Sequence, residues 1–291
     1  MPTWQDFQPF IVAGLALGGV YALSGVGMVV LYRATGVLNL AFGAVGAMGA
    51  FIAWTLINNT GVPPGVAYVV CVAFGGIVTL IYGVLFGPPL AARDPLVKAV
   101  ATLGLALILL GTMSWIWSDK ARSMDLPTSD SGFLVGQVQV NWTQVIALVF
   151  GLVLTIVTAS FLRYTNLGTA MRALANDREI TATLGVPVRR VEAVAWLGSG
   201  LISGFAGLLL SNLVGLDIVS LTFLVIPALA AALIAQLRSL WVTLIAGFVI
   251  GLVQSCLTAF TDLAEYRTMT PFVLAIVALL WFARAREPVR T

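Results

Sequence analysis

The chain has 291 residues, of which 60% are hydrophobic and 9% charged, and its mean hydropathy is +1.03. Soluble domains carry about 25% charged residues, so this composition excludes a soluble domain. It predicts an all-α polytopic membrane protein. The net charge of +3 comes without a basic block, which excludes a nucleic-acid surface. The chain has no histidine, which excludes His-based catalytic triads and His-containing metal sites.

Hydrophobic runs predict nine transmembrane segments, at about 10–31, 37–57, 65–86, 97–117, 142–162, 192–214, 218–235, 240–260 and 271–283. These segments use up nearly all of the chain, so we expect residues 1–291 to form a single transmembrane domain. The opening MPTWQDFQPF has neither the basic start nor the cleavage site of a signal peptide. We therefore expect the first segment to stay in place as a membrane anchor.

Three of these segments have irregular features. Gly36, Asn39 and Gly43 weaken the start of the second segment, which predicts a broken helix or a re-entrant start there. The seventh segment is interrupted by Pro227, and the ninth is short enough to need protein cover.

The basic residues predict the orientation of the chain. With the N-terminus outside and the C-terminus in the cytoplasm, three basic residues lie outside: Lys120, Arg122 and Arg267. The other twelve lie inside, and they are Arg33, Arg93, Lys98, Arg163, Arg172, Arg178, Arg189, Arg190, Arg238, Arg284, Arg286 and Arg290. The reversed orientation would violate the positive-inside rule.

The stretch from Arg163 to Glu192 is the only long polar interruption rich in charges of both signs. Candidate caps at Asn166 and Thr169, followed by helix formers and then by Gly185, predict a helix within about 166–187. A helix of roughly 15 residues is about 22 Å long, too short to cross the hydrocarbon, and this one is too charged to enter it. We expect it to lie in the cytoplasm, and a plain solvated loop is the alternative interpretation.

One face of this predicted helix is apolar, with Met171, Leu174, Ile180 and Leu184. Arg172 and Asn176 are four positions apart and share the opposite, polar face, which suits contact with a partner protein. Asp177 points elsewhere, so we expect it to act as an end cap or an intrachain anchor.

The distribution of charge also limits the mechanism. The interiors of the nine predicted segments contain no ionisable residue of the Asp, Glu, Lys, Arg or His types, so the intramembrane relay typical of proton-coupled transporters is missing. The chain lacks the phosphate-binding G-x-x-x-x-G-K-[ST] loop as well, so it cannot hydrolyse ATP alone. We therefore expect a non-catalytic subunit whose energy comes from partners. A sodium-coupled secondary transporter remains the alternative, because backbone carbonyls and hydroxyls can bind Na⁺.

Two motifs, in this order, resemble the permeases of branched-chain amino-acid ABC importers. The first comprises Gly18, Tyr21-Ala22-Leu23, Gly27, Tyr32, Gly36, Asn39, Ala41 and Gly43. The second comprises Gly168, Ala170, Arg172, Ala173, Asn176, Asp177, Ala182, Leu184, Gly185 and Val186, followed by Ala206-Gly207.

The resemblance implies a location in the bacterial inner membrane and a set of partners. These are two cytoplasmic ATPase subunits that carry ATP and Mg, a second homologous permease, and an extracytoplasmic solute-binding protein. No cofactor is implied in this chain.

The resemblance also implies site residues. For coupling to the ATPase they are Arg172, Ala173, Asn176, Asp177 and Gly185, and for the translocation pathway they are Tyr21, Ser24, Asn39, Phe42 and Gly43. Amide and peptide groups at a broken helix would guide a polar solute through the pore. The alternative is that Asn39 caps a helix and the glycines only permit packing.

Two departures from the family pattern concern the substrate. After Asn-x-Ala the family usually places His or Gln, Gly and an acidic residue, whereas this chain has Phe42, Gly43 and Ala44. The family's Gly-Gly-x-Gly-Ser turn is replaced by Gln236 to Ser239. We expect branched-chain amino acids as substrate, with urea, short amides or small organic acids as alternatives.

Overall fold

A computed structural model describes residues 4–118, 120, 122–124, 128, 131–135, 138–223, 225–260 and 263–285. Within these residues, seven helices are long and apolar enough to cross a membrane. They are α1 (Trp4–Thr35), α2 (Phe42–Thr60), α3 (Pro64–Leu90), α4 (Pro95–Trp117), α5 (Trp142–Tyr164), α8 (Val188–Leu213) and α11 (Leu240–Leu257).

The shorter elements connect or flank these helices. They are β1 (Gly132–Val135), β2 (Val138–Asn141), α6 (Asn166–Asn176), α7 (Arg178–Thr183), α9 (Ile218–Phe223), α10 (Val225–Ile234), a 3₁₀ helix at Ala264–Met269, and α12 (Thr270–Ala285). β1 and β2 form an antiparallel hairpin in which Gly132 lies opposite Asn141.

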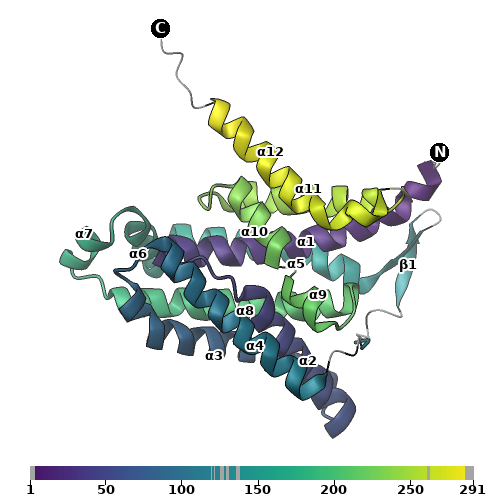
Figure 1. The fold of residues 1–291 in the computed structure, drawn as a ribbon, viewed down its shortest axis with the longest axis horizontal. Coiled ribbons are helices and arrows are strands. Elements are labelled where there is room, and N and C mark those ends of the chain that lie inside the picture. Colours follow the sequence, from purple (N-terminus) through teal and green to yellow (C-terminus); the bar gives the residue numbers. More distant parts are fainter. Residues whose placement is uncertain are drawn as a thin grey trace.

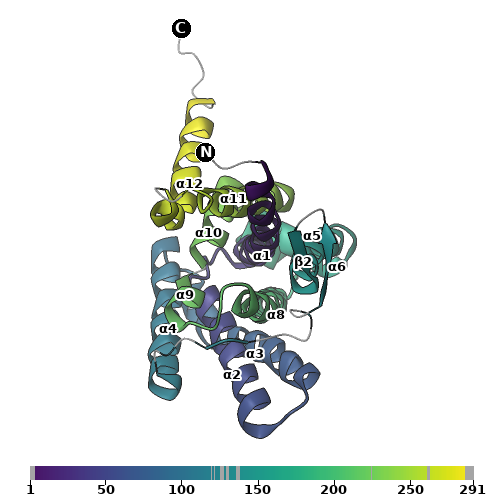
Figure 2. The same ribbon diagram turned by 90° about the vertical axis from the view of Figure 1, so that its right-hand side faces the viewer.

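α1 runs through the middle of the bundle (Figures 1 and 2). It packs against α5, α8, α10 and α11, while α3 packs along α8 and α2. α12 leaves the body of the bundle, and α4 crosses α2 obliquely (Figure 1). The hairpin and the N-terminus lie at one end of the bundle, and α6 and α7 lie at the other.

Large apolar side chains face outward from the bundle. Val69 of α3, Leu107 of α4 and Trp115 of α4 are 68%, 61% and 86% exposed, and α5 and α12 carry similar surfaces. Soluble proteins rarely expose contiguous apolar surface on this scale, because burying it from water is favourable. The prediction of an all-α polytopic membrane protein is therefore confirmed.

Seven of the nine predicted segments correspond to the seven long helices. The predicted seventh, 218–235, corresponds to α9 and α10, the apolar helical residues on either side of residue 224, which lies outside the described residues. Pro227 is buried within α10. The predicted ninth corresponds to α12, a helix of 16 residues. Arg286 and Arg290, which the orientation argument places inside, lie outside the described residues.

The chain between α1 and α2 is not helical, as the broken start of the second segment predicts. Thr102 of α4 supports this stretch, because its hydroxyl accepts a hydrogen bond from Leu40 N (3.0 Å) and lies 2.9 Å from Leu38 O. Irregular backbone at membrane depth is tolerated where it is buried in protein and its polar groups find partners. α2 consequently begins inside the bundle, at Phe42.

Candidate functional site

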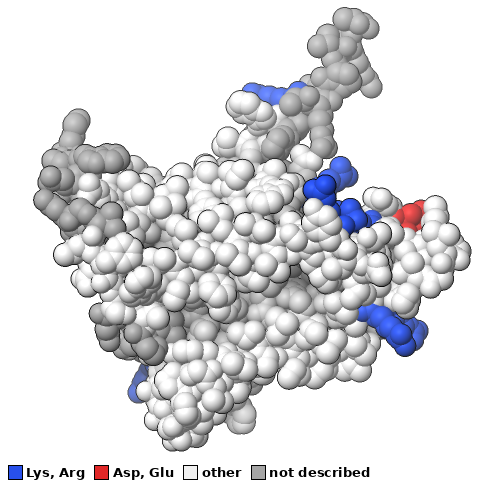
Figure 3. Space-filling model, turned by 180° about the vertical axis from the view of Figure 1, so that it is seen from behind, with Lys and Arg blue, Asp and Glu red and all other residues white. Residues whose placement is uncertain are grey.

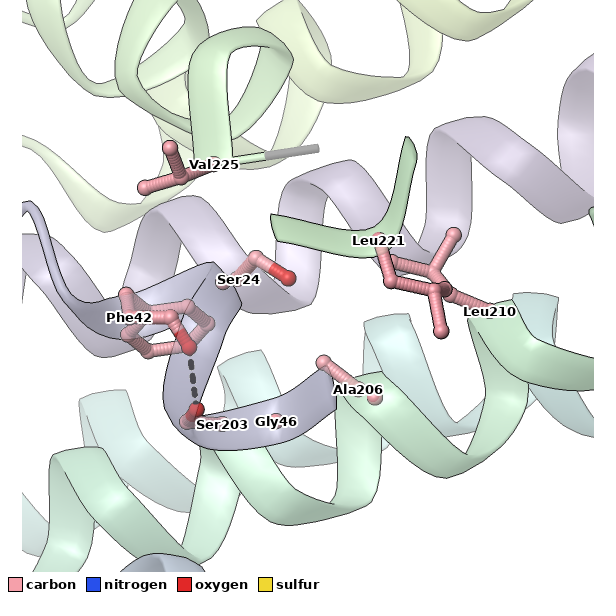
Figure 4. Close-up of a pocket in the computed structure, with 10 residues that line it drawn as sticks. Ser24, Phe42, Gly46, Ser203, Ala206, Leu210, Leu221 and Val225 are labelled. Carbon is pink, nitrogen blue, oxygen red and sulfur yellow. Dashed lines mark hydrogen bonds between the residues drawn. The ribbon is translucent and has the colours of Figure 1, made fainter. Parts of the chain in front are cut away.

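A small buried cavity lies between α1, α2, α8, α9 and α10 (Figure 4). Its volume is about 10 Å³, close to the minimum space that holds one water molecule. The lining residues are Ser24, Phe42, Gly43, Gly46, Ser203, Ala206, Gly207, Leu210, Leu221 and Val225. In this conformation the cavity is too small for any solute of amino-acid size.

The walls of the cavity consist largely of backbone in direct contact. A Cβ atom on Gly207 of α8 would lie 2.2 Å from the carbonyl oxygen of Gly46 in α2. A Cβ on Gly43 would lie 2.3 Å from the carbonyl oxygen of Thr222 in α9. Atoms this close must move apart, so the absence of side chains lets both α8 and α9 approach α2.

Polar groups in the cavity come from two serines. The Ser203 hydroxyl donates to the carbonyl oxygen of Phe42 at 2.5 Å and so joins α8 to the first turn of α2 (Figure 4). The Ser24 hydroxyl, on α1, points into the space between Phe42 and Leu221 in the same view. Both serines are buried.

The predicted pathway residues fall into two groups. Ser24, Phe42 and Gly43 line the cavity, whereas Tyr21 and Asn39 are absent from its lining. Tyr21 is buried. Asn39 is buried too, and its Oδ1 accepts from Ala41 N at 3.0 Å. Asn39 thus stabilises the turn that leads into α2. This role is close to that of a helix cap, the alternative considered for Asn39.

Sequence reasoning missed the lining residues from α8, α9 and α10. The signal for α8 was the run of small residues Ser199, Gly200, Ser203, Gly204 and Gly207, which indicated close packing without identifying the partner helix. No comparable pattern marks Leu221 or Val225.

The second candidate region is the segment α6–α7, residues 166–183. The prediction of one continuous helix is wrong, because the backbone of Asp177 is extended (φ −153°) and separates α6 from α7. Asp177 Oδ1 accepts from Ile180 N at 2.9 Å, so the expected role of Asp177 as an end cap is confirmed. The predicted caps Asn166 and Thr169 are also wrong, since Thr165 caps α6 by accepting from Gly168 N at 3.0 Å.

The break changes which side chains face the bundle. Met171 and Leu174 of α6 are buried as predicted, but Ile180 and Leu184 are 60% and 76% exposed. The predicted apolar face therefore extends only along α6. Beyond Asp177 the helical register is interrupted, so Ile180 and Leu184 face away from the bundle.

The predicted coupling residues lie at the surface of this segment. Arg172 and Asn176 are exposed on α6, and Ala173 is half-buried between them. The guanidinium of Arg172 lies 3.4 Å from the carbonyl oxygen of Arg163 and 3.3 Å from the Thr169 hydroxyl. Arg172 is therefore partly held by its own chain.

Gly185 and one ion pair fix the exit towards α8. Gly185 has φ +81°, a conformation that glycine adopts without strain and that other residues reach at a cost of about 1–2 kcal/mol. Arg178 and Glu192 form an ion pair at 3.0 Å that ties α7 to α8. Basic side chains on the face in Figure 3 gather mainly at the end formed by α6 and α7.

Among the described residues, no three His, Cys, Asp or Glu side chains lie close enough to hold a metal ion. The two candidate regions are instead a small cavity between helices and an exposed polar segment at one end of the bundle. Together with the long apolar helices, they define a multi-pass helical membrane protein with a potential interior passage.

Residues 10–279 match the family described as branched-chain amino acid transport system, permease component. This chain belongs to that family. It is 29% identical to the probable branched-chain amino acid transport permease protein LivH of Methanocaldococcus jannaschii, over 89% of this chain and 85% of the relative.

Two bacterial relatives cover more of the chain. The high-affinity branched-chain amino acid transport system permease protein BraD of Pseudomonas aeruginosa is 26% identical over 97% of this chain and 95% of its own length. The corresponding protein LivH of Escherichia coli is 25% identical over 92% of this chain and 91% of its own length.

Proposed function

We propose that this chain is the transmembrane permease subunit of an ABC importer and forms part of the pathway for branched-chain amino acids. The observation that carries the proposal is the match to the permease family over residues 10–279. The sequence lacks a phosphate-binding loop, so the chain is non-catalytic and its partners supply the energy. ATP and Mg bind on those partners, and this chain carries no cofactor.

The partners in this proposal are two cytoplasmic ATPase subunits, a second homologous permease and an extracytoplasmic solute-binding protein. The size of the cavity supports the need for these partners, because a cavity of about 10 Å³ is too small to let an amino acid through in the present conformation. Opening then requires a helix rearrangement that a partner drives.

The same proposal includes the number of membrane segments and the orientation of the chain in the membrane. Residues 1–291 form one permease domain with nine membrane segments in the bacterial inner membrane, with the N-terminus outside and the C-terminus in the cytoplasm. The position of α6 and α7 at the end opposite the hairpin supports this orientation (Figure 1), because that end carries Arg163, Arg172 and Arg178.

In the coupling step, the segment at about 166–187 docks in a groove on an ATPase subunit. α6 follows α5 directly and α7 is tied to α8, so displacement of this segment must tilt at least one of those two helices. α8 supplies Ser203 and Gly207 to the cavity. Movement at the cytoplasmic end can therefore change the cavity.

The substrate is a branched-chain amino acid, which is the cargo in the names of the relatives LivH and BraD. Phe42 lines the cavity at a position where the family usually places a polar residue, so urea, short amides or small organic acids are the alternatives. Calorimetric titration of the solute-binding protein tests this point. Tight binding of urea without leucine, isoleucine or valine would overturn the choice.

Reconstitution in liposomes tests the mechanism. The complete complex should import leucine when ATP is present on the cytoplasmic side of the liposome membrane. The purified chain alone should neither hydrolyse ATP nor import leucine. Uptake by the chain alone, driven by a sodium gradient, would establish the secondary-transporter alternative instead. A complex whose ATPase subunits lack the phosphate-binding lysine is the matched control.

A further inference from the structure

A short strap, residues 122–124, crosses the end of the bundle that carries the hairpin. Its backbone joins the loop between α8 and α9, because Arg122 N donates to Leu216 O at 3.1 Å and Leu216 N donates to Arg122 O at 2.8 Å. Asn212 of α8 also holds the strap, donating from Nδ2 to Met124 O at 2.9 Å. The strap is thus fixed to both sides of the connection that leads into α9.

The side chain of Arg122 adds two further elements to this junction. Its guanidinium donates to the carbonyl oxygen of Trp117, at the end of α4, at 2.6 Å. It also lies 4.9 Å from the centre of the Trp54 ring of α2, within the range of a cation–π interaction. Trp54 in turn donates from Nε1 to Ser123 O at 3.2 Å. A single half-buried arginine therefore connects α2, α4 and the start of α9.

α9 is the element that covers the cavity on this side. Leu221 lines the cavity, and the backbone of Thr222 rests on Gly43 of α2. α9 packs on α2, and the residues just before it anchor its N-terminal end. Leu216, two residues before α9 begins, is fully buried and paired with Arg122.

We propose that Arg122 is a positioning residue that holds α9 over the cavity as its extracytoplasmic cover, and that release of the Arg122 junction opens the cavity to the outer side. The inference rests on the proposed function, which places this end of the bundle outside the cytoplasm. Arg122 does not touch the cavity, so it acts through Leu216 and α9.

The test is the accessibility of a thiol in the cavity. The chain carries Ser24→Cys with Cys71→Ala and Cys256→Ala, in right-side-out membrane vesicles treated with a membrane-impermeant, positively charged methanethiosulfonate. With Arg122 present, labelling should be slow. Arg122→Ala should raise the labelling rate by about tenfold or more, the shift expected when a hydrogen bond from a charged group is lost. Arg122→Lys keeps the charge without the planar fork and should give an intermediate rate.

Two controls separate positioning from general loosening. Arg267→Ala removes another exposed arginine predicted on the same side and should leave the labelling rate unchanged. A thiol at Thr155→Cys, fully buried on α5 outside the cavity, should stay unlabelled in the Arg122→Ala chain. General unfolding would expose both thiols.

The proposal is wrong if the folded Arg122→Ala or Arg122→Lys chain labels at the parent rate, or if both thiols become reactive together. It is also wrong if the faster labelling occurs only in inside-out vesicles, which expose the cytoplasmic face. The measurement needs no transport. Failure of the complete complex to import leucine would therefore refute the proposed function while leaving the labelling result intact.

Discussion

The cavity and the α6–α7 segment are held in place by largely different kinds of contact. Around the cavity, backbone meets backbone without intervening side chains, as at Gly46 and Gly207. The α6–α7 segment is attached mainly through the buried side chains Met171 and Leu174 and a partly exposed ion pair, and its backbone approaches α5 closely at Gly168. The cavity therefore cannot change without moving whole helices, whereas the segment presents a surface that can be altered with little effect on folding.

The largest effect on stability is expected at Gly207. There a close backbone contact and an open position can be compared on the same helix, α8. Gly207→Ala places a Cβ 2.2 Å from the carbonyl oxygen of Gly46, so α2 and α8 must separate. Overpacking of this kind costs about 1–3 kcal/mol or more. Thermal unfolding in detergent should show a lower midpoint and less folded protein in the membrane fraction.

The matched control for this variant is Gly198→Ala, also on α8. A Cβ at Gly198 meets no atom within 4 Å, and alanine is the better helix former by about 1 kcal/mol. Its unfolding midpoint should equal or exceed that of the parent. Equal losses of stability in the two variants would contradict the assignment of the cavity wall to backbone contact.

The second effect concerns Gly185, at the exit from the α6–α7 segment. A β-branched residue at φ +81° is strained, so Gly185→Val should lower stability by about 1–2 kcal/mol and abolish ATP hydrolysis coupled to transport. Gly185→Asn is the control, because asparagine tolerates this conformation and should keep most of the activity. Membrane insertion should be intact in both variants. Normal coupling in Gly185→Val would show that the turn does not transmit movement.

How far the sequence predicts the molecule depends on how local each feature is. The break before α2 was predicted because Gly36 and Asn39 act on their own turns. The break at Asp177 was missed because Arg178 to Thr183 are acceptable helix residues, and the ion pair to Glu192 that holds α7 joins residues 14 positions apart.

The same distinction applies to the cavity. Ser24, Phe42 and Gly43 were predicted from a motif close to the N-terminus, and they do line it. The Ser203 contact joins residues 161 positions apart, so the environment of Ser203 cannot be derived from the neighbouring sequence. Long-range helix pairing, more than helix formation, decided which residues reach the cavity.

A third effect should change function and leave stability nearly unchanged. Arg172→Glu reverses an exposed charge on α6, so it should alter the free energy of unfolding by no more than about 0.5 kcal/mol. In the reconstituted complex it should abolish transport-coupled ATP hydrolysis, because like charges that face each other, or a charge that loses its partner, lower the affinity at a docking surface. Arg189→Glu makes the same charge change at an exposed position of α8 outside this segment and should transport like the parent. If Arg172→Glu also transports like the parent, the segment is only a solvated loop.

The smallest effect is expected from the ion pair between Arg178 and Glu192. Arg178 is 46% exposed and Glu192 is 12% exposed, so solvent screens much of the attraction between them. A double-mutant cycle with Arg178→Met, Glu192→Gln and the double variant should give a coupling energy of about 0.2–1 kcal/mol in thermal or denaturant unfolding. That energy should shrink at 1 M salt, where the Debye length is about 3 Å. The two variants should nevertheless reduce coupled ATP hydrolysis in the complex, since the pair is a side-chain link between α7 and α8. A coupling energy well above 1 kcal/mol would mean that α7 is part of the rigid bundle, and the contrast between the cavity and the α6–α7 segment would then be wrong.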